Sequence, residues 1–300
     1  MILNPQVLAL ISATISLNFA GAQDDDKQDS PVITPYLISW LVHDTNIDRD
    51  DQRIKSWGVV YGAGLQYKSD ADKPLFEASY EVAKHNYSSF DEFDRVSHAF
   101  SGIVHHKFSD QWRADLLAEV AFKGSSEDRD INDSVSIQPR FEYRITDDER
   151  LKLRMNYRWR KPPIDPNGRH QNRYAEFIYE KRLPRNHTIS ASIRHEINRS
   201  VFDGNHYNRT IYGVEWETEP TDKDTISIEL KFKDRRYTVR EVTKGVQRQD
   251  ESWVIEADWE HFFDTRWSVL VDYRMERRTS NDPDEDFIQR VFGLGTKLRF

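Results

Sequence analysis

Apolar and polar residues alternate along most of this chain with the two-residue period of a β-strand, whose successive side chains point to opposite faces. The pattern is clearest at 151–160, where every second residue is apolar and the residues between are basic or asparagine. From residue 31 onward the alternation defines fourteen segments: Val32–Asp44, Ile54–Lys68, Leu75–Asn86, Arg95–Phe108, Trp112–Phe122, Val135–Arg144, Leu151–Arg160, Tyr174–Arg182, Thr188–Ile197, Arg209–Thr218, Ile226–Lys233, Trp253–Glu260, Trp267–Glu276 and Phe287–Phe300. In the first segment we place Tyr36, Ile38 and Trp40 on the apolar face. Segments of about 9–11 residues can cross a bilayer as tilted strands.

The connections between these segments also follow a pattern. After even-numbered segments they are short turns, at 109–111, 146–149, 184–187 and 263–266; after odd-numbered segments they are long and polar, at 124–133, 161–172, 198–208, 237–251 and 277–286. Outer-membrane β-barrels have such short periplasmic turns and long extracellular loops. Because every backbone polar group must be paired in hydrocarbon, membrane strands must close into a cylinder. The pattern therefore predicts an all-β fold, a transmembrane antiparallel β-barrel of 14 strands with short periplasmic turns and long extracellular loops.

Aromatic residues support the same fold. Several tryptophans lie on the apolar faces near segment ends, where outer-membrane barrels carry girdles of aromatic rings at the two membrane surfaces. The predicted membrane girdle consists of Trp112, Trp159, Trp216, Trp253, Trp259, Trp267 and Phe300. The alternative, a soluble β-domain, would need a second apolar layer to cover these faces. The opposite faces are too charged to supply one, since charges are not buried in a dry core.

The composition fits a barrel and excludes other classes. Charged residues make up 31% of the 300 residues and the mean hydropathy is −0.79, which excludes a bundle of membrane helices with about 20 apolar residues each. A barrel tolerates these values because only every second residue faces lipid. The net charge of −8 argues against a nucleic-acid partner, which would require a basic surface. The chain has no cysteine, as expected for a compartment in which free thiols are a liability.

The first residues differ from the rest of the chain. Val7–Ala20 is an uncharged apolar run that is too short to span a bilayer as a helix, and it ends in the small residues Ala20, Gly21 and Ala22. These features predict a signal peptide at 1–22, although its first six residues contain no Lys or Arg; a buried helix is the alternative. We expect a periplasmic segment at 23–30 and the barrel at 31–300. The protein would then be secreted to the periplasm and inserted into the cell outer membrane.

The polar faces predict a charged lumen filled with water, because a barrel of this width is not filled by side chains. The predicted basic residues of the lumen are Arg140, Arg144, Lys152, Arg154, Arg158, Arg160, Lys231, Lys233 and Arg274. The predicted acidic residues are Glu77, Glu81, Glu142, Glu215, Glu217, Glu229, Glu256, Asp258, Glu260, Asp272 and Glu276. Opposed basic and acidic walls create a transverse field that orients dipolar solutes. Neighbouring inward charges can also pair with each other, and we expect both effects.

The architecture resembles the outer membrane protein G family of monomeric, fourteen-stranded, weakly selective porins. The likeness covers the precursor in length, strand number and loop rhythm, and locally it lies in Trp267–Tyr273, in Gly293–Gly295 before Phe300, and in the turn Ile145–Asp148. The resemblance implies passive diffusion of ions, monosaccharides and oligosaccharides through one chain without a cofactor or a metal. The same resemblance implies partners: outer-membrane lipid and lipopolysaccharide, and the barrel-assembly machinery that binds a closing strand ending at Phe300.

The resemblance also implies a flexible gate in the sixth extracellular loop. Here that loop is 237–251, the longest, and its candidate gating residues are Tyr237, Lys244, Gly245, Arg248 and Glu251. The family's pH switch uses a histidine pair beside the gate. Here the twelfth segment offers His261, near its periplasmic end, and the thirteenth offers no histidine, so the switch is not carried over.

Two other functions are considered. The oligogalacturonate-specific porins, usually twelve-stranded, pass acidic oligosaccharides through basic lumens, and the arginines at 140–160 keep that solute class open. The second is a barrel enzyme such as an outer-membrane lipase, because the stretch 194–200 faintly resembles the motif of outer-membrane phospholipases. Nucleophilic catalysis would need a serine on the same face as His195, and position 197 is Ile. His105 and His106 are adjacent and point to opposite faces, so they do not chelate a metal together.

Overall fold

The computed structural model describes residues 31–46, 55–69, 75–88, 94–125, 131–161, 170–200 and 206–300. Its elements are β1 (Val32–Asp44), β2 (Ser56–Lys68), β3 (Phe76–Tyr87), β4 (Arg95–Lys107), β5 (Trp112–Ser125), β6 (Ile131–Arg144), β7 (Glu149–Lys161), β8 (His170–Leu183), β9 (His187–Arg199), β10 (Tyr207–Thr221), β11 (Asp224–Thr243), β12 (Val246–Phe262), β13 (Trp267–Ser280), the 3-10 helix η3 (Pro283–Glu285) and β14 (Phe287–Arg299). The predicted signal peptide, the segment 23–30 and the acidic run Asp24–Asp26 lie outside the described residues.

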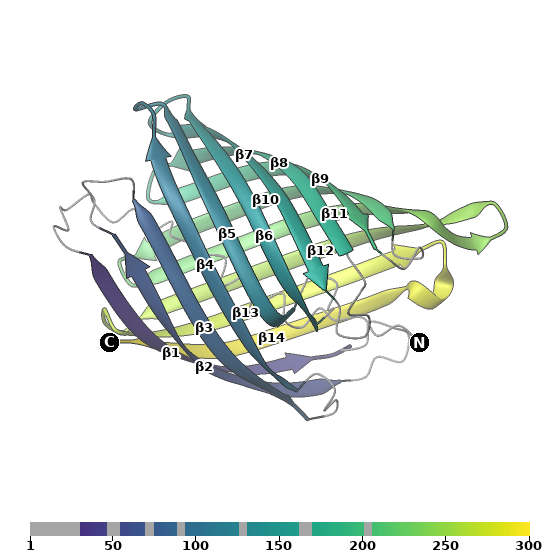
Figure 1. Ribbon diagram of the computed structural model, residues 1–300, viewed down its shortest axis with the longest axis horizontal. Helices are drawn as coiled ribbons and strands as arrows, with labels where there is room; N and C mark the ends of the chain where they lie inside the picture. The colour runs from purple at the N-terminus through teal and green to yellow at the C-terminus, as the bar shows by residue number, and fades with distance from the viewer. Residues whose placement is uncertain are drawn as a thin grey trace.

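The strands form one closed sheet in sequence order, with β1 paired to β14 (Figure 1). Each strand is antiparallel to both neighbours; at the closure the register runs from Tyr36 opposite Arg299 to Asp44 opposite Val291. The amide of Phe300 extends this pairing by donating a hydrogen bond to the carbonyl of Pro35 at 2.9 Å. Closure leaves no unpaired strand edge. The predicted fold class, an antiparallel barrel of 14 strands, is confirmed.

The two faces of the wall differ in chemistry as the alternation predicts. Outward positions of the mid-strand region carry large apolar side chains that are exposed, such as Phe141, Leu153, Phe177, Val214 and Leu230. A continuous apolar exterior of this kind is unusual for a soluble monomer and suits a hydrocarbon environment. Among the described residues, no helix has the length and apolarity to cross a membrane.

The aromatic residues predicted as a girdle lie on outward positions. Trp112, Trp159, Trp253, Trp259, Trp267 and Phe300 are exposed there, and Trp216 stacks on His187 with ring centroids 5.8 Å apart. Trp57 also lies outward, close to the start of β2, and stacks on His43. The predicted girdle lacks Trp57, although this residue also lies on the apolar face of its strand and near the strand end.

The face assigned to β1 is wrong. Tyr36 and Trp40 point to the interior and are 4% and 5% exposed, whereas Leu37 and Leu41 point outward. Both parities of this strand are apolar, so alternation alone could not choose between them. The neighbouring strands decide, because they carry glycines where the aromatic rings lie. A Cβ added at Gly64 or Gly295 would collide with the ring of Tyr36 or Trp40, respectively.

The segment predicted as the sixth loop, 237–251, is not a loop. Tyr237 lies within β11, whereas Arg248 and Glu251 lie within β12, and the strands meet at a tight turn at Lys244 and Gly245. Gly245 has a φ of +81°, which suits glycine because it lacks a Cβ. Figure 1 shows this hairpin projecting beyond the rest of the barrel. Residues 237–251 are rich in charge on both faces, so they show no apolar–polar alternation although they continue β11 and β12.

Candidate functional site on the inner wall

The inner face of the barrel carries the charged residues predicted for the lumen. The basic residues of that set occupy inward positions of β6, β7, β11 and β13, and the acidic residues occupy inward positions of β3, β6 and β10–β13. In the closed strand order β8 and β9 separate the acidic residues of β10–β13 from the basic residues of β6 and β7. We call the latter the basic ladder, which consists of Arg140, Arg144, Lys152, Arg154, Arg158 and Arg160. Figure 1 shows β6 and β7 on the near wall and β10–β12 on the far wall.

Strand β8 supplies acidic partners that the sequence analysis did not assign. Glu176 lies between two arginines, with Oε1 3.0 Å from Nη2 of Arg194 and Oε2 3.8 Å from Nη1 of Arg154. Glu180 forms an ion pair with Lys152. The alternation along β8 could have identified both glutamates, because they lie on the same polar face as His170, Asn172 and Tyr174. Pairing between neighbours therefore compensates part of the basic ladder.

Three of the basic residues on β6 and β7 form no ion pair with another residue in the described part of the chain, and they are Arg140, Arg144 and Arg158. Arg140 instead donates to Oε1 of Gln138 at 2.7 Å. The side chain of Arg154 is 38% exposed. The ladder on β6 and β7 therefore presents positive charge to open space inside the barrel.

The acidic wall contains a row of carboxylates on adjacent strands. Glu215 of β10 lies opposite Glu229 of β11, which lies opposite Glu256 of β12. Lys231 bridges two of them, with Nζ 2.7 Å from Glu229 and 2.6 Å from Glu256. Arg274 of β13 reaches Glu256 at 3.0 Å. These cations hold the carboxylates in place and neutralise part of their charge.

A second acidic row lies one step nearer the β12–β13 turn. Asp258 is directly opposite Asp272, and Ser227 donates to Oδ2 of Asp258 at 3.2 Å. This row has no basic residue at the paired positions of β11, β12 and β13. Among the described residues, no group of three or more His, Cys, Asp or Glu side chains is arranged to hold a metal ion. Carboxyl groups therefore cluster on this part of the wall.

The interior is not uniformly polar. Val60, Val254 and Val291 occupy inward positions and are at most 1% exposed. Together with Tyr36 and Trp40 they fill space beside β1, β2, β12 and β14. The charged residues of this side are also covered, since the Arg274 side chain is 5% exposed. Arg154 of β7, whose side chain is 38% exposed, is more accessible.

The β11–β12 hairpin is tied to the connection between β13 and β14. Arg240 and Arg248 both contact Oε1 of Glu285 in η3, at 2.8 and 2.7 Å. Arg248 also lies over the Tyr237 ring, 4.7 Å from its centroid, and donates to Asp250 at 2.8 Å. The candidate gating residues Tyr237 and Arg248 are thus packed into the hairpin base, while Lys244 and Gly245 form its tip and Glu251 is exposed on the outer face.

The histidines considered for metal binding, catalysis and a pH switch lie at separate places on the wall. His105 points inward and shares a hydrogen bond with Asp115 at 2.7 Å, whereas His106 points outward and packs on Phe108. Their predicted divergence is confirmed. His195 points outward and contacts Thr210. His261 lies at the turn end of β12 and contacts Asp224 at 2.8 Å.

No protein-family model and no curated protein sequence matches the chain. Solved structures of outer-membrane barrels do resemble it. An anion-selective porin from Comamonas acidovorans aligns with a TM-score of 0.54 at 7% identity, covering 90% of this chain and 99% of that one. A loop L8 deletion mutant of OmpT, an outer membrane protein of Vibrio cholerae, aligns with a TM-score of 0.53 at 11% identity, covering 91% of this chain and 100% of that one. At these identities the likeness establishes a shared barrel fold.

Proposed function

We propose that this chain is an outer-membrane porin that gives passive diffusion of small hydrophilic solutes through a charged lumen. The observation that carries the proposal is the division of one closed wall into an apolar exterior and a charged interior. A closed cylinder satisfies the backbone in hydrocarbon, and only the exterior then needs to be apolar. The fold of the anion-selective porin from Comamonas acidovorans supports the same class.

The solutes we propose are ions, monosaccharides and oligosaccharides, passing through a single chain as in the outer membrane protein G family. The partly unpaired arginines on β6 and β7 favour anionic groups, because Arg154 is among the more exposed charges of the inner face. The acidic rows on β10–β13 lie across the interior from part of this ladder and complete a transverse field. A preference for acidic oligosaccharides is the second candidate, and the unpaired arginines favour it.

We further propose that the β11–β12 hairpin controls entry to the lumen. Its attachment to η3 depends on two arginines that share one carboxylate, Glu285. The Arg240 side chain is 35% exposed, so its pair with Glu285 is weak and is screened by salt, whereas the Arg248 side chain is buried at 1%. The hairpin would therefore detach more often as ionic strength rises.

Planar-bilayer recording of the refolded protein tests the porin function. A monomeric pore gives ohmic currents with one level per insertion, whereas a trimer gives steps in groups of three. Block by an acidic oligosaccharide and not by a neutral one would favour the second candidate. Absence of any conductance from protein whose circular dichroism shows a folded barrel would refute the proposal.

Charge reversal tests the role of the ladder. Arg154→Glu together with Arg158→Glu is expected to shift the reversal potential in a salt gradient towards cation selectivity, because both side chains lie on the inner face of β7. Lys181→Glu is the matched control, since Lys181 carries the same charge on the outward face of β8. Equal reversal potentials in the double variant and in wild type would show that the ladder does not influence solute choice.

A further inference from the structure

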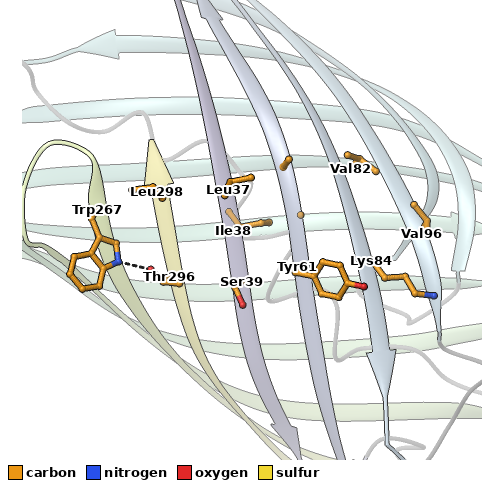
Figure 2. A pocket seen from close by; sticks show the side chains of 12 residues that line it. Leu37, Ile38, Ser39, Tyr61, Val82, Lys84, Val96, Trp267, Thr296 and Leu298 are labelled. Carbon is orange, nitrogen blue, oxygen red and sulfur yellow. Dashed lines mark hydrogen bonds between the residues drawn. The ribbon is translucent and has the colours of Figure 1, made fainter. Parts of the chain in front are cut away.

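The outer wall has a recess over the strands that close the barrel. It has a volume of about 850 Å³, and its apolar lining includes Leu37, Val82, Val96, Trp267 and Leu298 from β1, β3, β4, β13 and β14. Figure 2 shows these side chains with Lys84 at one end and Trp267 at the other. The recess exists because its floor contains small residues of β1 and β2, namely Ser39, Gly62 and Ala63. An apolar depression on a surface that faces lipid offers space for hydrocarbon.

A row of polar residues crosses this recess on outward positions of adjacent strands. Thr296 lies opposite Ser39, Ser39 opposite Tyr61, and Tyr61 opposite Lys84. On β8 to β12 the outward positions near the strand middle are apolar, as at Phe177, Ile193, Val214, Leu230 and Ile255. The polar row is therefore a local feature of this part of the wall.

Lys84 is the charged member of the row, and it has no ionic partner or hydrogen bond among the described residues. Two other polar pairs of this wall are satisfied internally. Trp267 donates to Thr296 at 2.7 Å, and Tyr80 shares a hydrogen bond with His98 at 3.0 Å. A lysine on the lipid face costs about 2–4 kcal/mol at the bilayer midplane and less near the surface. An external anion would offset this cost.

The polarity of the recess matches an amphiphilic molecule. Lys84 lies three residues before Tyr87, the end of β3, while Leu298 and Trp267 lie at the opposite end of the wall, beside the short β12–β13 turn. A lysine can extend along the wall towards the membrane surface while its stem contacts hydrocarbon. A lipid of the outer leaflet would place its phosphate at Lys84 and its acyl chain towards Leu298.

A second copy of this chain offers a poorer partner for Lys84. The outward carboxylates of the described strands include Asp133, Glu149, Asp224, Asp234 and Glu251. Those with printed partners are already engaged, such as Asp234, which pairs with Arg236 at 2.9 Å. A concave surface on one copy would also require a convex apolar element on the next.

We propose that this recess binds an anionic lipid of the outer leaflet, with the lipid phosphate on Lys84 and an acyl chain along Leu37, Val82 and Leu298. The inference rests on the proposed membrane location of the barrel. The contact with phosphate would be a charge-assisted hydrogen bond. The recess supplies the apolar contact, so headgroup charge and chain are recognised by separate parts of the wall.

Native mass spectrometry of the purified full chain in detergent tests this proposal, with phosphatidic acid as the probe and phosphatidylcholine of the same acyl chains as the reference. Lys84→Gln is expected to weaken phosphatidic acid binding about tenfold and phosphatidylcholine binding by less, because the phosphate of phosphatidylcholine is balanced by its own choline. Ala63→Phe, which fills the floor of the recess, is expected to weaken both lipids. Lys181→Gln is the control because that outward lysine pairs with Glu149 outside the recess, and it should bind both lipids as wild type does.

Two results would overturn the proposal. One is equal phosphatidic acid binding by wild type and Lys84→Gln in samples that circular dichroism shows to be folded. The other is an oligomer in detergent without added lipid that Ala63→Phe dissociates, which would make a second copy the occupant. Conductance of the same samples is measured separately, so a failure of the porin function is distinguishable from a failure of lipid binding.

Discussion

Replacing Gly295 by alanine tests how tightly β14 packs against the inward rings of β1. A Cβ at position 295 would lie 2.5 Å from Cδ2 and 2.6 Å from Cε3 of Trp40. The Trp40 side chain has little free space in which to move aside, since the residue is 5% exposed. Gly293 is the matched control on the same strand and face, because its added Cβ would lie 3.4 Å from the nearest atom, Oδ2 of Asp272.

Two opposing effects set the magnitude. Inserting a methyl group into a well-packed region costs about 1–3 kcal/mol. Replacing glycine in an extended strand stabilises by about 0.4–1 kcal/mol, because the unfolded chain loses conformational freedom. We therefore expect Gly295→Ala to lower the free energy of unfolding by about 1–2 kcal/mol, and Gly293→Ala to raise it by about 0.5 kcal/mol.

The measurement is urea unfolding of protein folded in lipid vesicles, followed by far-ultraviolet circular dichroism. A double-mutant cycle with Trp40→Leu isolates the collision, since Gly295→Ala should become neutral or slightly stabilising once the indole is gone. The reasoning fails if Gly293→Ala is as destabilising as Gly295→Ala. It also fails if the cost of Gly295→Ala is the same with leucine at position 40.

Three further predictions concern ion pairs and a turn. Arg209→Met should destabilise the barrel by about 3–5 kcal/mol in urea titrations, because it leaves the Glu196 carboxylate, 2.7 Å from Arg209 and 3% exposed, without this buried partner. In the β12–β13 turn, hydrogen bonds from two backbone amides lower the pKa of Asp264 below its ordinary value. A lowered folded-state pKa stabilises the fold above the unfolded pKa of about 4 and loses this effect as the pH falls through the folded value, so Asp264→Asn should reduce stability at pH 7 and flatten its decline in acid. Arg240→Gln removes one contact of the hairpin with Glu285 and should increase the frequency of current fluctuations in single-channel recordings, with less dependence on salt than in wild type.

Most of the fold could be predicted from the sequence because a barrel wall repeats one simple rule. Strand β7 alternates without exception, and its outward Leu153 and inward Arg154 lie as the pattern indicates. The strand ends were less predictable. The pattern stopped β11 at Lys233 and began β12 at Trp253, yet the strands run to Thr243 and from Val246. Beyond the apolar band both faces of a strand are polar, so the alternation disappears while the backbone pairing continues.

The candidate site shows a similar limit. The positions of Arg154 and Lys152 on the inner face follow from parity, but their partners Glu176 and Glu180 depend on register between β7 and β8. Register is set by turn geometry and cross-strand contacts, which a single alternation pattern does not encode. The sequence therefore predicts which charges face inward, and only the three-dimensional register shows which of them are compensated.

The reversed face of β1 follows from the same dependence on neighbours, and it changes the interior. A strand with apolar residues on both faces is oriented by the strands beside it, and here Gly64 and Gly295 leave room for inward rings that larger residues would exclude. The rings of Tyr36 and Trp40 consequently fill the side of the interior next to β2 and β14. Open space then remains beside the opposite strands β6 and β7, where Arg154 is exposed. If solutes pass through this barrel, the packing at β1 directs them along the arginines of the ladder, so a pair of glycines far from that ladder determines which charges the solute meets.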